Sequence, residues 1–184
     1  PVSGFDTNGP LANTLRFFAS TPDRKPSIQI NAAKNILPTN STSKIPVSTI
    51  NISKLNIDIY EIDQRSITEV NYLFKNLSTY DIKYSLPFYG KKVVSNEIEI
   101  SKTLNNEKKF NIDLNKYLKK SVNGVFVAIL SDQKDAYINA TKWIMKSDVA
   151  ITSYYGEKTT DLFFTNFQTS NSIKNIDIKI LAKN

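Results

Sequence analysis

Apolar and polar residues alternate along most of the chain. Leu55, Ile57 and Ile59 alternate with Asn56 and Asp58, which is the two-residue period of a half-buried β-strand. The same alternation, or a short apolar run, predicts seven strands at 28–30, 47–52, 55–59, 93–100, 110–114, 125–130 and 137–145. Because no long parallel crossover separates them, these segments predict an all-β fold, an antiparallel seven-stranded Ig-like β-sandwich.

Three stretches depart from simple alternation. Residues 125–130 are apolar at every position, which is typical of a central strand that is buried on both faces. The alternation changes phase at Tyr60, as a bulge or a twist would cause. Ser66 and Glu69 then fit a capping box, and apolar residues recur at helical spacing after them. We therefore expect one short helix near 66–75, inserted between strands of the sandwich.

A second group of strands begins directly after the first. The strand at 137–145 ends in the polar break Lys146-Ser147-Asp148, which has no glycine or proline, and the strand pattern resumes at once. Two such segments with almost no linker predict that one domain ends here and that another begins, stacked closely on the first. The expected interdomain joint consists of Trp143, Met145, Ser147, Asp148 and Val149.

The chain divides into three parts on this interpretation. Residues 1–25 are a lead-in segment, residues 26–146 form the sandwich, and residues 147–184 start a second, truncated sandwich with strands at 149–155, 161–169 and 176–181. The apolar faces of these last strands have no second sheet to cover them, and exposing such a face costs several kcal/mol. We therefore expect the chain to self-associate through residues 149–181.

Aromatic residues are concentrated around the joint and in the strands after it. We expect them to fill the core of the sandwich and the interdomain contact; they are Trp143, Tyr154, Tyr155, Phe163, Phe164 and Phe167.

The sequence around the joint resembles a known family. The run A-T-x-W-I-x-x-S-D-V-x-I-T-x-Y at 140–154, followed by D-L-F-F-T-N-F-Q-T at 161–169, is similar to a domain junction of bacterial α2-macroglobulins. Upstream, the segments I-L-P, I-P-V, N-I and I-Y-E-I, which lie between residues 36 and 62, occur in the order and spacing of that family. The resemblance covers roughly residues 26–184. It implies a macroglobulin (MG) domain followed by the first strands of another.

The composition removes most enzymatic options. The sequence has no cysteine and no histidine, which excludes disulfides, thiolate chemistry, imidazole zinc sites and the usual catalytic triad. Residues 41–44 match the S-x-x-K motif of serine β-lactamases, but the partner motifs S-D-N and K-T-G do not occur. Glu97 and Glu99 share one face of a strand, where we interpret them as solvated charges. We expect no enzymatic activity and no cofactor.

The net charge of +7 comes mainly from lysine, since only three residues are arginine. Proteins that read nucleic acids favour the bidentate guanidinium group. A local basic cluster could bind anionic headgroups, cell-wall phosphate or nucleic acid, but no aromatic stacking platform is interleaved with it. We interpret it as a solubilising surface and expect no nucleic-acid partner; its members are Lys108, Lys109, Lys116, Lys119 and Lys120.

The family resemblance implies a scaffold role. Bacterial α2-macroglobulins are chains of MG sandwiches that enclose and trap proteases after a bait segment is cut, and many carry a thioester in a C-x-E-Q motif. They are typically periplasmic, anchored to the inner membrane through a lipidated cysteine, and some act beside a penicillin-binding protein. Without cysteine, this sequence carries none of the thioester residues. The implied partners are neighbouring MG domains, and target proteases and possibly a penicillin-binding protein through the intact parent. The residues alone leave a second class open, an Ig-like adhesin or a carbohydrate-binding surface module.

Overall fold

In the computed structural model, which describes residues 21–32, 35–39, 43–101, 104–118 and 123–179, the alternating segments form two facing sheets. The strands of this sandwich are β1 (Ser27–Ile30), β2 (Ile36–Leu37), β3 (Lys44–Ile50), β4 (Lys54–Ile62), β5 (Gly90–Glu99), β6 (Glu107–Asp113), β7 (Gly124–Asp132) and β8 (Asn139–Lys146). The helical elements are η1 (Gln64–Ser66), α1 (Ile67–Asn76), α2 (Thr79–Ser85), η2 (Leu86–Phe88) and η3 (Leu114–Lys116).

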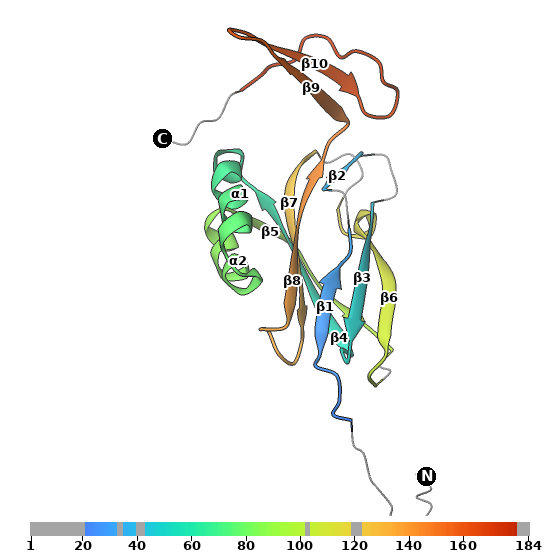
Figure 1. The fold of residues 1–184 in the computed structure, drawn as a ribbon. Coiled ribbons are helices and arrows are strands. Elements are labelled where there is room, and N and C mark those ends of the chain that lie inside the picture. Colours follow the sequence, from blue (N-terminus) through green and yellow to red (C-terminus); the bar gives the residue numbers. More distant parts are fainter. Residues whose placement is uncertain (1–20, 33–34, 40–42, 102–103, 119–122, 180–184) are drawn as a thin grey trace, which may run out of the picture.

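The two sheets and the helices form three layers (Figure 1). The middle layer is a five-stranded sheet with the order β2-β8-β7-β4-β5, and a three-stranded sheet with the order β1-β3-β6 faces it. The helices α1 and α2 cover the other face of the five-stranded sheet. This arrangement confirms the predicted macroglobulin-type sandwich and the central position of the strand at 125–130.

Two details of the predicted fold are wrong. The two-residue strand β2 adds an eighth strand to the sandwich, and it pairs with β8 in parallel; so short a segment carries no periodic signal. A second helix, α2, follows α1, where the pattern predicted only one. Its N-cap is Ser78, whose hydroxyl accepts a hydrogen bond from the Asp81 N–H (3.2 Å) and donates one to the Asp81 carboxylate (2.6 Å).

The predicted capping box at Ser66 does not form. No side-chain hydrogen bond caps α1 at Ser66, and the hydroxyl of Thr68 donates to Glu69 (2.8 Å) instead. The 3-10 turn η1 precedes α1, and the Ser66 N–H bonds to the Asp63 carbonyl (2.9 Å). A side-chain N-cap needs an extended backbone at the capping residue. Here the chain enters the first turn of α1 from the 3-10 turn η1, so Ser66 does not have that conformation.

Two apolar clusters hold the layers together. One lies between the sheets and the other between the five-stranded sheet and the helices. Along β7, residues 126, 128 and 130 join the first cluster, whereas residues 125, 127 and 129 join the second. The strand is therefore apolar at every position because both of its faces are covered.

The helix layer also explains the change of phase at Tyr60. Leu55, Ile57 and Ile59 face the cluster between the sheets, and Tyr60 and Ile62 face the helices. The pairing of β4 with β7 stays regular through this region. The register with β5 does shift between Ile59 and Tyr60, which confirms the predicted irregularity.

Gly90 lies where β5 starts beside β4, and its backbone has no room for a side chain. A Cβ atom at this position would lie 2.3 Å from the carbonyl oxygen of Glu61. We expect Gly90→Ala to lower the free energy of unfolding by about 1–3 kcal/mol, since overpacking forces backbone shifts. Urea unfolding measures the change. The matched control is Gly156→Ala, where the added Cβ meets the Thr159 hydroxyl at 3.1 Å; similar losses for both variants would contradict this interpretation.

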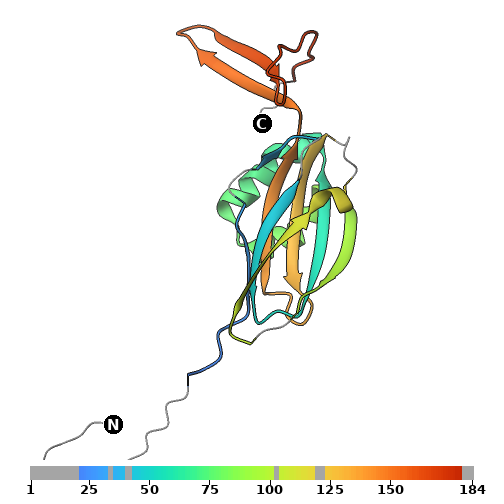
Figure 2. The ribbon, with the colours of Figure 1, turned by 90° about the vertical axis from the view of Figure 1, so that its right-hand side faces the viewer.

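A separate hairpin follows the sandwich (Figures 1 and 2). It consists of β9 (Val149–Tyr155) and β10 (Thr160–Asn166), which pair with each other in an antiparallel, two-stranded sheet. The strand predicted at 176–181 is wrong over 176–179, where the chain has no regular structure; residues 180 and 181 lie outside the described residues. Only an isolated bridge between Thr165 and Ser172 extends the pairing within the described part of this segment.

The chain enters the sandwich at the end opposite the hairpin. Residues 1–20 of the predicted lead-in lie outside the described residues. The end of the lead-in is fixed by Asn105, whose side chain accepts from the Arg24 N–H (2.8 Å) and donates to Asp23 (2.9 Å).

No helix in the described ranges has the length and apolar character of a membrane span.

Candidate functional site

The predicted interdomain joint lies where β8 leaves the sandwich. Trp143 and Met145 point toward the helix-covered face of the sheet, where both are partly buried. The ring of Trp143 packs edge-on against Phe74 of α1, with ring centroids 6.1 Å apart. The Met145 N–H donates to the carbonyl of Asn35 (2.7 Å), which ties the end of β8 to the start of β2.

Ser147 and Asp148 are the only residues between β8 and β9, and both are hydrogen-bonded. The Ser147 N–H donates to the Leu37 carbonyl (3.2 Å), and its hydroxyl oxygen accepts from the Val149 N–H (3.0 Å). This local bond constrains the first residue of the hairpin relative to the break. The short connection is therefore not a free linker.

Asp148 connects three segments of the chain. One carboxylate oxygen accepts from the Thr39 N–H (2.8 Å), and the other accepts from the Thr39 hydroxyl. The Asp148 carbonyl accepts from the N–H of Phe167, just after β10 (2.7 Å). Through this one residue the end of the sandwich, the loop after β2 and the base of the hairpin are joined.

A buried lysine lies beside this contact. Lys146, the last residue of β8, is fully buried. Burial lowers the pKa of its amine, and the nearby Asp148 carboxylate opposes that shift. Asp148 therefore provides both hydrogen-bond acceptors for Thr39 and a favourable charge for Lys146.

The structure brings the five predicted joint residues together only in part. Ser147, Asp148 and Val149 meet at the break, whereas Trp143 and Met145 pack below it against the helix layer. Sequence reasoning missed Leu37 and Thr39, which supply the partners of Ser147 and Asp148. The only signal was the I-L-P run beside them, which was used for the family resemblance and not for the joint.

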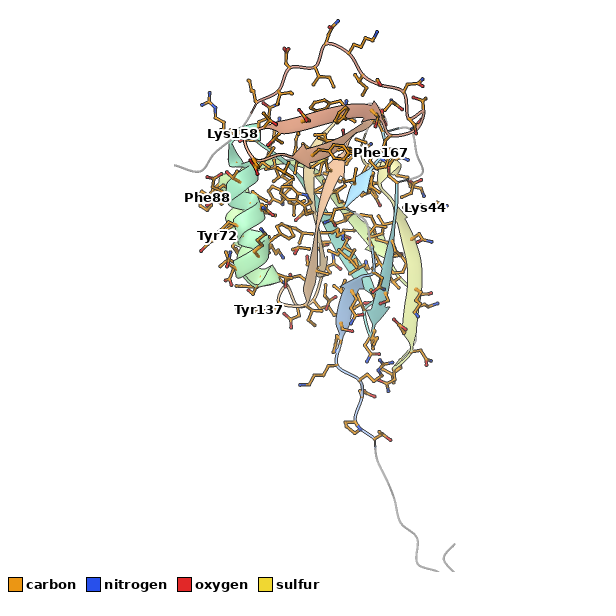
Figure 3. The ribbon with its side chains drawn as sticks, turned by 45° about the horizontal axis from the view of Figure 1, so that its top comes forward. Lys44, Tyr72, Phe88, Tyr137, Lys158 and Phe167 are labelled. Carbon is orange, nitrogen blue, oxygen red and sulfur yellow. The ribbon has the colours of Figure 1, made fainter. Side chains whose placement is uncertain are left out.

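The aromatic residues of the hairpin do not fill a core. Tyr155 is 81% exposed, and Tyr154, Phe163 and Phe167 are also exposed. Phe167 lies near the base of the hairpin (Figure 3). The expectation that these rings pack into the sandwich or the joint is wrong for this chain, because the described residues place no second layer over either face of the hairpin. Of the six aromatic residues in this expectation, Trp143 does pack in the sandwich, against Phe74, and Phe164 is half-buried.

The comparisons with known proteins identify the family of the sandwich. Residues 31–143 match the family model for the bacterial alpha-2 macroglobulin MG2 domain. The chain belongs to this family. No curated protein sequence matches the chain.

Solved structures of bacterial α2-macroglobulins share the fold of this MG2-family chain. The native Escherichia coli protein spanning domains NIE-MG1 is 15% identical with a TM-score of 0.62, over 83% of this chain and 75% of that one. The cryo-EM reconstruction of the native E. coli protein is 15% identical with a TM-score of 0.65, over 90% of this chain and 11% of that one. Salmonella α2-macroglobulin reacted with methylamine is 16% identical with a TM-score of 0.56, over 80% of this chain and 8% of that one. The chain thus spans about a tenth of the length of these two relatives.

Other candidate residues of the MG2-family chain form ordinary surface contacts. Glu97 accepts a hydrogen bond from Gln133 (2.9 Å), and Glu99 lies 3.3 Å from the exposed amine of Lys54. Both carboxylates are exposed, as the interpretation as solvated charges predicted. Residues 41 and 42 of the S-x-x-K run, and Lys119 and Lys120 of the basic cluster, lie outside the described residues. Among the residues described, no group of three or more acidic side chains could hold a metal ion.

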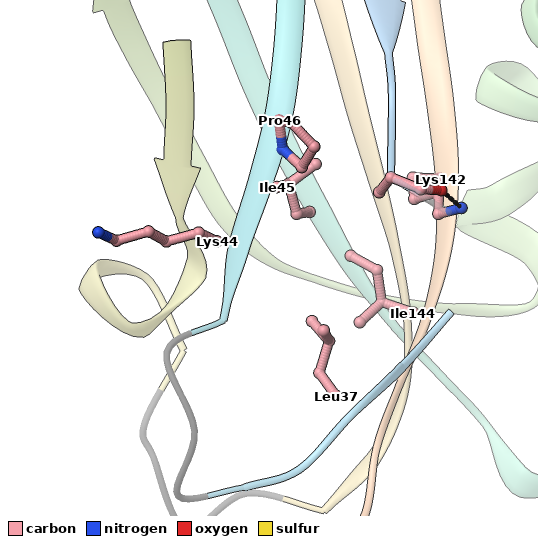
Figure 4. Close-up of a pocket in the computed structure, with 7 residues that line it drawn as sticks. Leu37, Lys44, Ile45, Pro46, Lys142 and Ile144 are labelled. Carbon is pink, nitrogen blue, oxygen red and sulfur yellow. Dashed lines mark hydrogen bonds between the residues drawn. The ribbon is translucent and has the colours of Figure 1, made fainter. Parts of the chain in front are cut away.

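A cavity of about 200 Å³ opens between the two sheets beside β2 (Figure 4). Its walls are mainly apolar, and they include Leu37, Ile45 and Ile144. Lys142 also lines it, and its amine donates to the carbonyl of Ala32 (2.7 Å). Burial lowers the pKa of this amine. Lys142 thus links β8 to the chain after β1 across the open side of the sandwich.

Asp148→Ala is expected to loosen the joint. The substitution leaves the N–H and hydroxyl of Thr39, a buried residue, without their acceptors. We expect the free energy of unfolding to fall by about 1–3 kcal/mol, the usual cost of leaving a buried hydrogen-bonding group without a partner. Amide exchange should also become faster at Phe167, whose N–H bonds to the Asp148 carbonyl.

The matched control for Asp148→Ala is Asp161→Ala, which removes an exposed carboxylate from β10. This change should stay within about 0.5 kcal/mol, as is usual for surface substitutions. Urea unfolding and hydrogen exchange measure both variants. Equal behaviour of the two variants would show that Asp148 does not hold the joint.

Proposed function

We propose that residues 26–146 are one structural module of a longer bacterial protease-trapping protein, and that residues 147–184 begin the next module. The observation that carries the proposal is the joint. Only Ser147 and Asp148 separate β8 from a hairpin whose apolar residues are exposed, and Asp148 fixes both sides of the break. A hairpin held in this way offers a start for a second sandwich.

The role of the module is mechanical on this proposal. Two packed clusters make the sandwich rigid, and a connection of two hydrogen-bonded residues passes its orientation to the following segment. Stacked domains joined in this way can build the wall of a cage. We propose that the module performs no catalysis itself and that it binds neighbouring MG domains of the same parent chain.

Membership of the family supports a proposal for the partners and the location of the parent. The E. coli relative has been solved in a trypsin-activated form, which supports proteases as the targets of the parent. We propose that the intact protein traps proteases in the periplasm, anchored to the inner membrane by a lipid, and that a penicillin-binding protein acts beside it. The family match favours this function over the alternative of an Ig-like adhesin or a carbohydrate-binding surface module.

A protection assay on the parent protein tests this function. A trapped protease should keep its activity on a small peptide and lose its activity on a large protein substrate. We expect the parent to protect large substrates, and a flexible Gly-Ser insertion between Lys146 and Val149 to weaken protection, because it uncouples the two modules. Residues 1–184 alone should show neither protection nor hydrolase activity.

The matched control places the same insertion in the turn between β9 and β10, at Gly156, where the chain is exposed. Protection should then stay near that of the unmodified parent. Stoichiometric inhibition by residues 1–184 alone would overturn the scaffold role. Equal protection with either insertion would overturn the mechanical role of the joint.

A further inference from the structure

A second cavity lies on the helix side of the sandwich, at the edge formed by β2 and β8. Its volume is about 370 Å³, near the lower end of the range for small-molecule sites. It is lined by Asn35, Ile67, Thr68, Asn71, Phe74 and Trp143. Trp143 is also one of the predicted joint residues, but the hydrogen bonds that hold the break at Ser147 and Asp148 involve no side chain of this lining.

The chemistry of the lining is neutral and mixed. Phe74 and Trp143 provide two aromatic rings in edge-on contact. Asn35 and Asn71 are exposed, and neither side-chain amide has a hydrogen-bond partner among the described residues. An amide both donates and accepts hydrogen bonds. No residue of the lining carries a charge, so the cavity favours a ligand that is neutral and has several hydroxyl or amide groups beside an apolar face.

We propose that this cavity binds one neutral sugar unit of a glycan. The C–H face of a sugar ring can pack on the aromatic side chains, while its hydroxyl groups bond to Asn35, Asn71 and Thr68. A purely apolar ligand fits less well, because it would bury the two amides without partners. A nucleotide fits less well because no cation lines the cavity to pair with its phosphate.

The position of the cavity makes the proposal directly testable. Trp143 is the only tryptophan in the sequence, so the tryptophan fluorescence of the chain reports on this cavity. Titration of residues 1–184 with N-acetylglucosamine and with glucose should give a saturable change for at least one sugar. A dissociation constant in the millimolar range is expected for so small a ligand. Glycerol, which has hydroxyl groups but no ring face, should give no saturable change.

Two variants with the same substitution separate binding from general effects. Asn71→Ala removes an amide from the lining and should weaken binding roughly fivefold to tenfold, as the loss of one hydrogen bond does. Asn96→Ala removes an exposed amide from β5, at the far edge of the same sheet, and should leave binding unchanged. Urea unfolding of both variants checks that the fold is retained.

Three outcomes would overturn the proposal. The first is no saturable fluorescence change with either sugar, and the second is an equal response to glycerol. The third is unchanged sugar affinity in Asn71→Ala. Each of them leaves the protease-protection result unaffected, because the parent's trapping activity is measured separately and needs no sugar.

Discussion

Phe126→Ala is expected to lower the free energy of unfolding by about 3–5 kcal/mol, the usual cost of removing a buried phenylalanine ring. Phe126 lies on the central strand β7, is 1% exposed, and packs in the cluster between the two sheets. Its neighbours across the strand pairs are Glu61 and Ile144, so the surrounding backbone is fixed by hydrogen bonds on both sides. The cavity left by the ring cannot close by local movement.

The control for this prediction is the same substitution at an exposed ring. Phe88, which is 84% exposed after α2 (Figure 3), should change stability by no more than about 0.5 kcal/mol when replaced by alanine. Urea unfolding compares the two variants directly. Because small domains are stable by only about 5–15 kcal/mol, Phe126→Ala should also show a much lower midpoint. Equal midpoints would show that the layer between the sheets is not the main core.

The second large effect is expected at the hairpin. Its strand pairing places Val149, Ile151, Leu162 and Phe164 on one face, with Ile151 directly opposite Phe164. Ile151 is 62% exposed, and no second sheet covers this face within the described residues. Exposed apolar faces and open strand edges favour association. We therefore expect the chain to form dimers through the hairpin at micromolar concentrations, as measured by sedimentation velocity.

The double variant Ile151→Thr with Leu162→Thr should abolish this association. Threonine retains β-propensity, so the hairpin can still form. Burying each of the replaced side chains contributes about 1.5–3 kcal/mol, so the dimer constant should fall by at least about a hundredfold. The control is Tyr154→Thr, which alters the opposite face at a residue that is also 62% exposed. An unmodified chain that stays monomeric throughout the micromolar range would contradict the prediction.

Much of the sandwich could be predicted because its signals are local. Leu55, Ile57 and Ile59 are two residues apart, so they lie on one face of a strand, and that face must be buried whichever strands pair with it. The unbroken apolar run in β7 likewise requires cover on both faces. The helix α2 was missed although Ser78 and Asp81 form a local cap, because the surrounding aromatic residues are poor helix formers when taken alone. Packing against β8 stabilises this helix in the fold.

By itself, the sequence determined most of the strands, the central position of β7, and the break at Ser147 and Asp148, since each depends on side chains within a few residues of one another. Only the tertiary structure decided what holds that break. Asp148 bonds to Thr39, 109 residues earlier in the chain, and no periodic pattern encodes a contact over that distance. The cavity beside Trp143 was hidden for the same reason, because the chain must fold before Asn35, Asn71 and Trp143 come together.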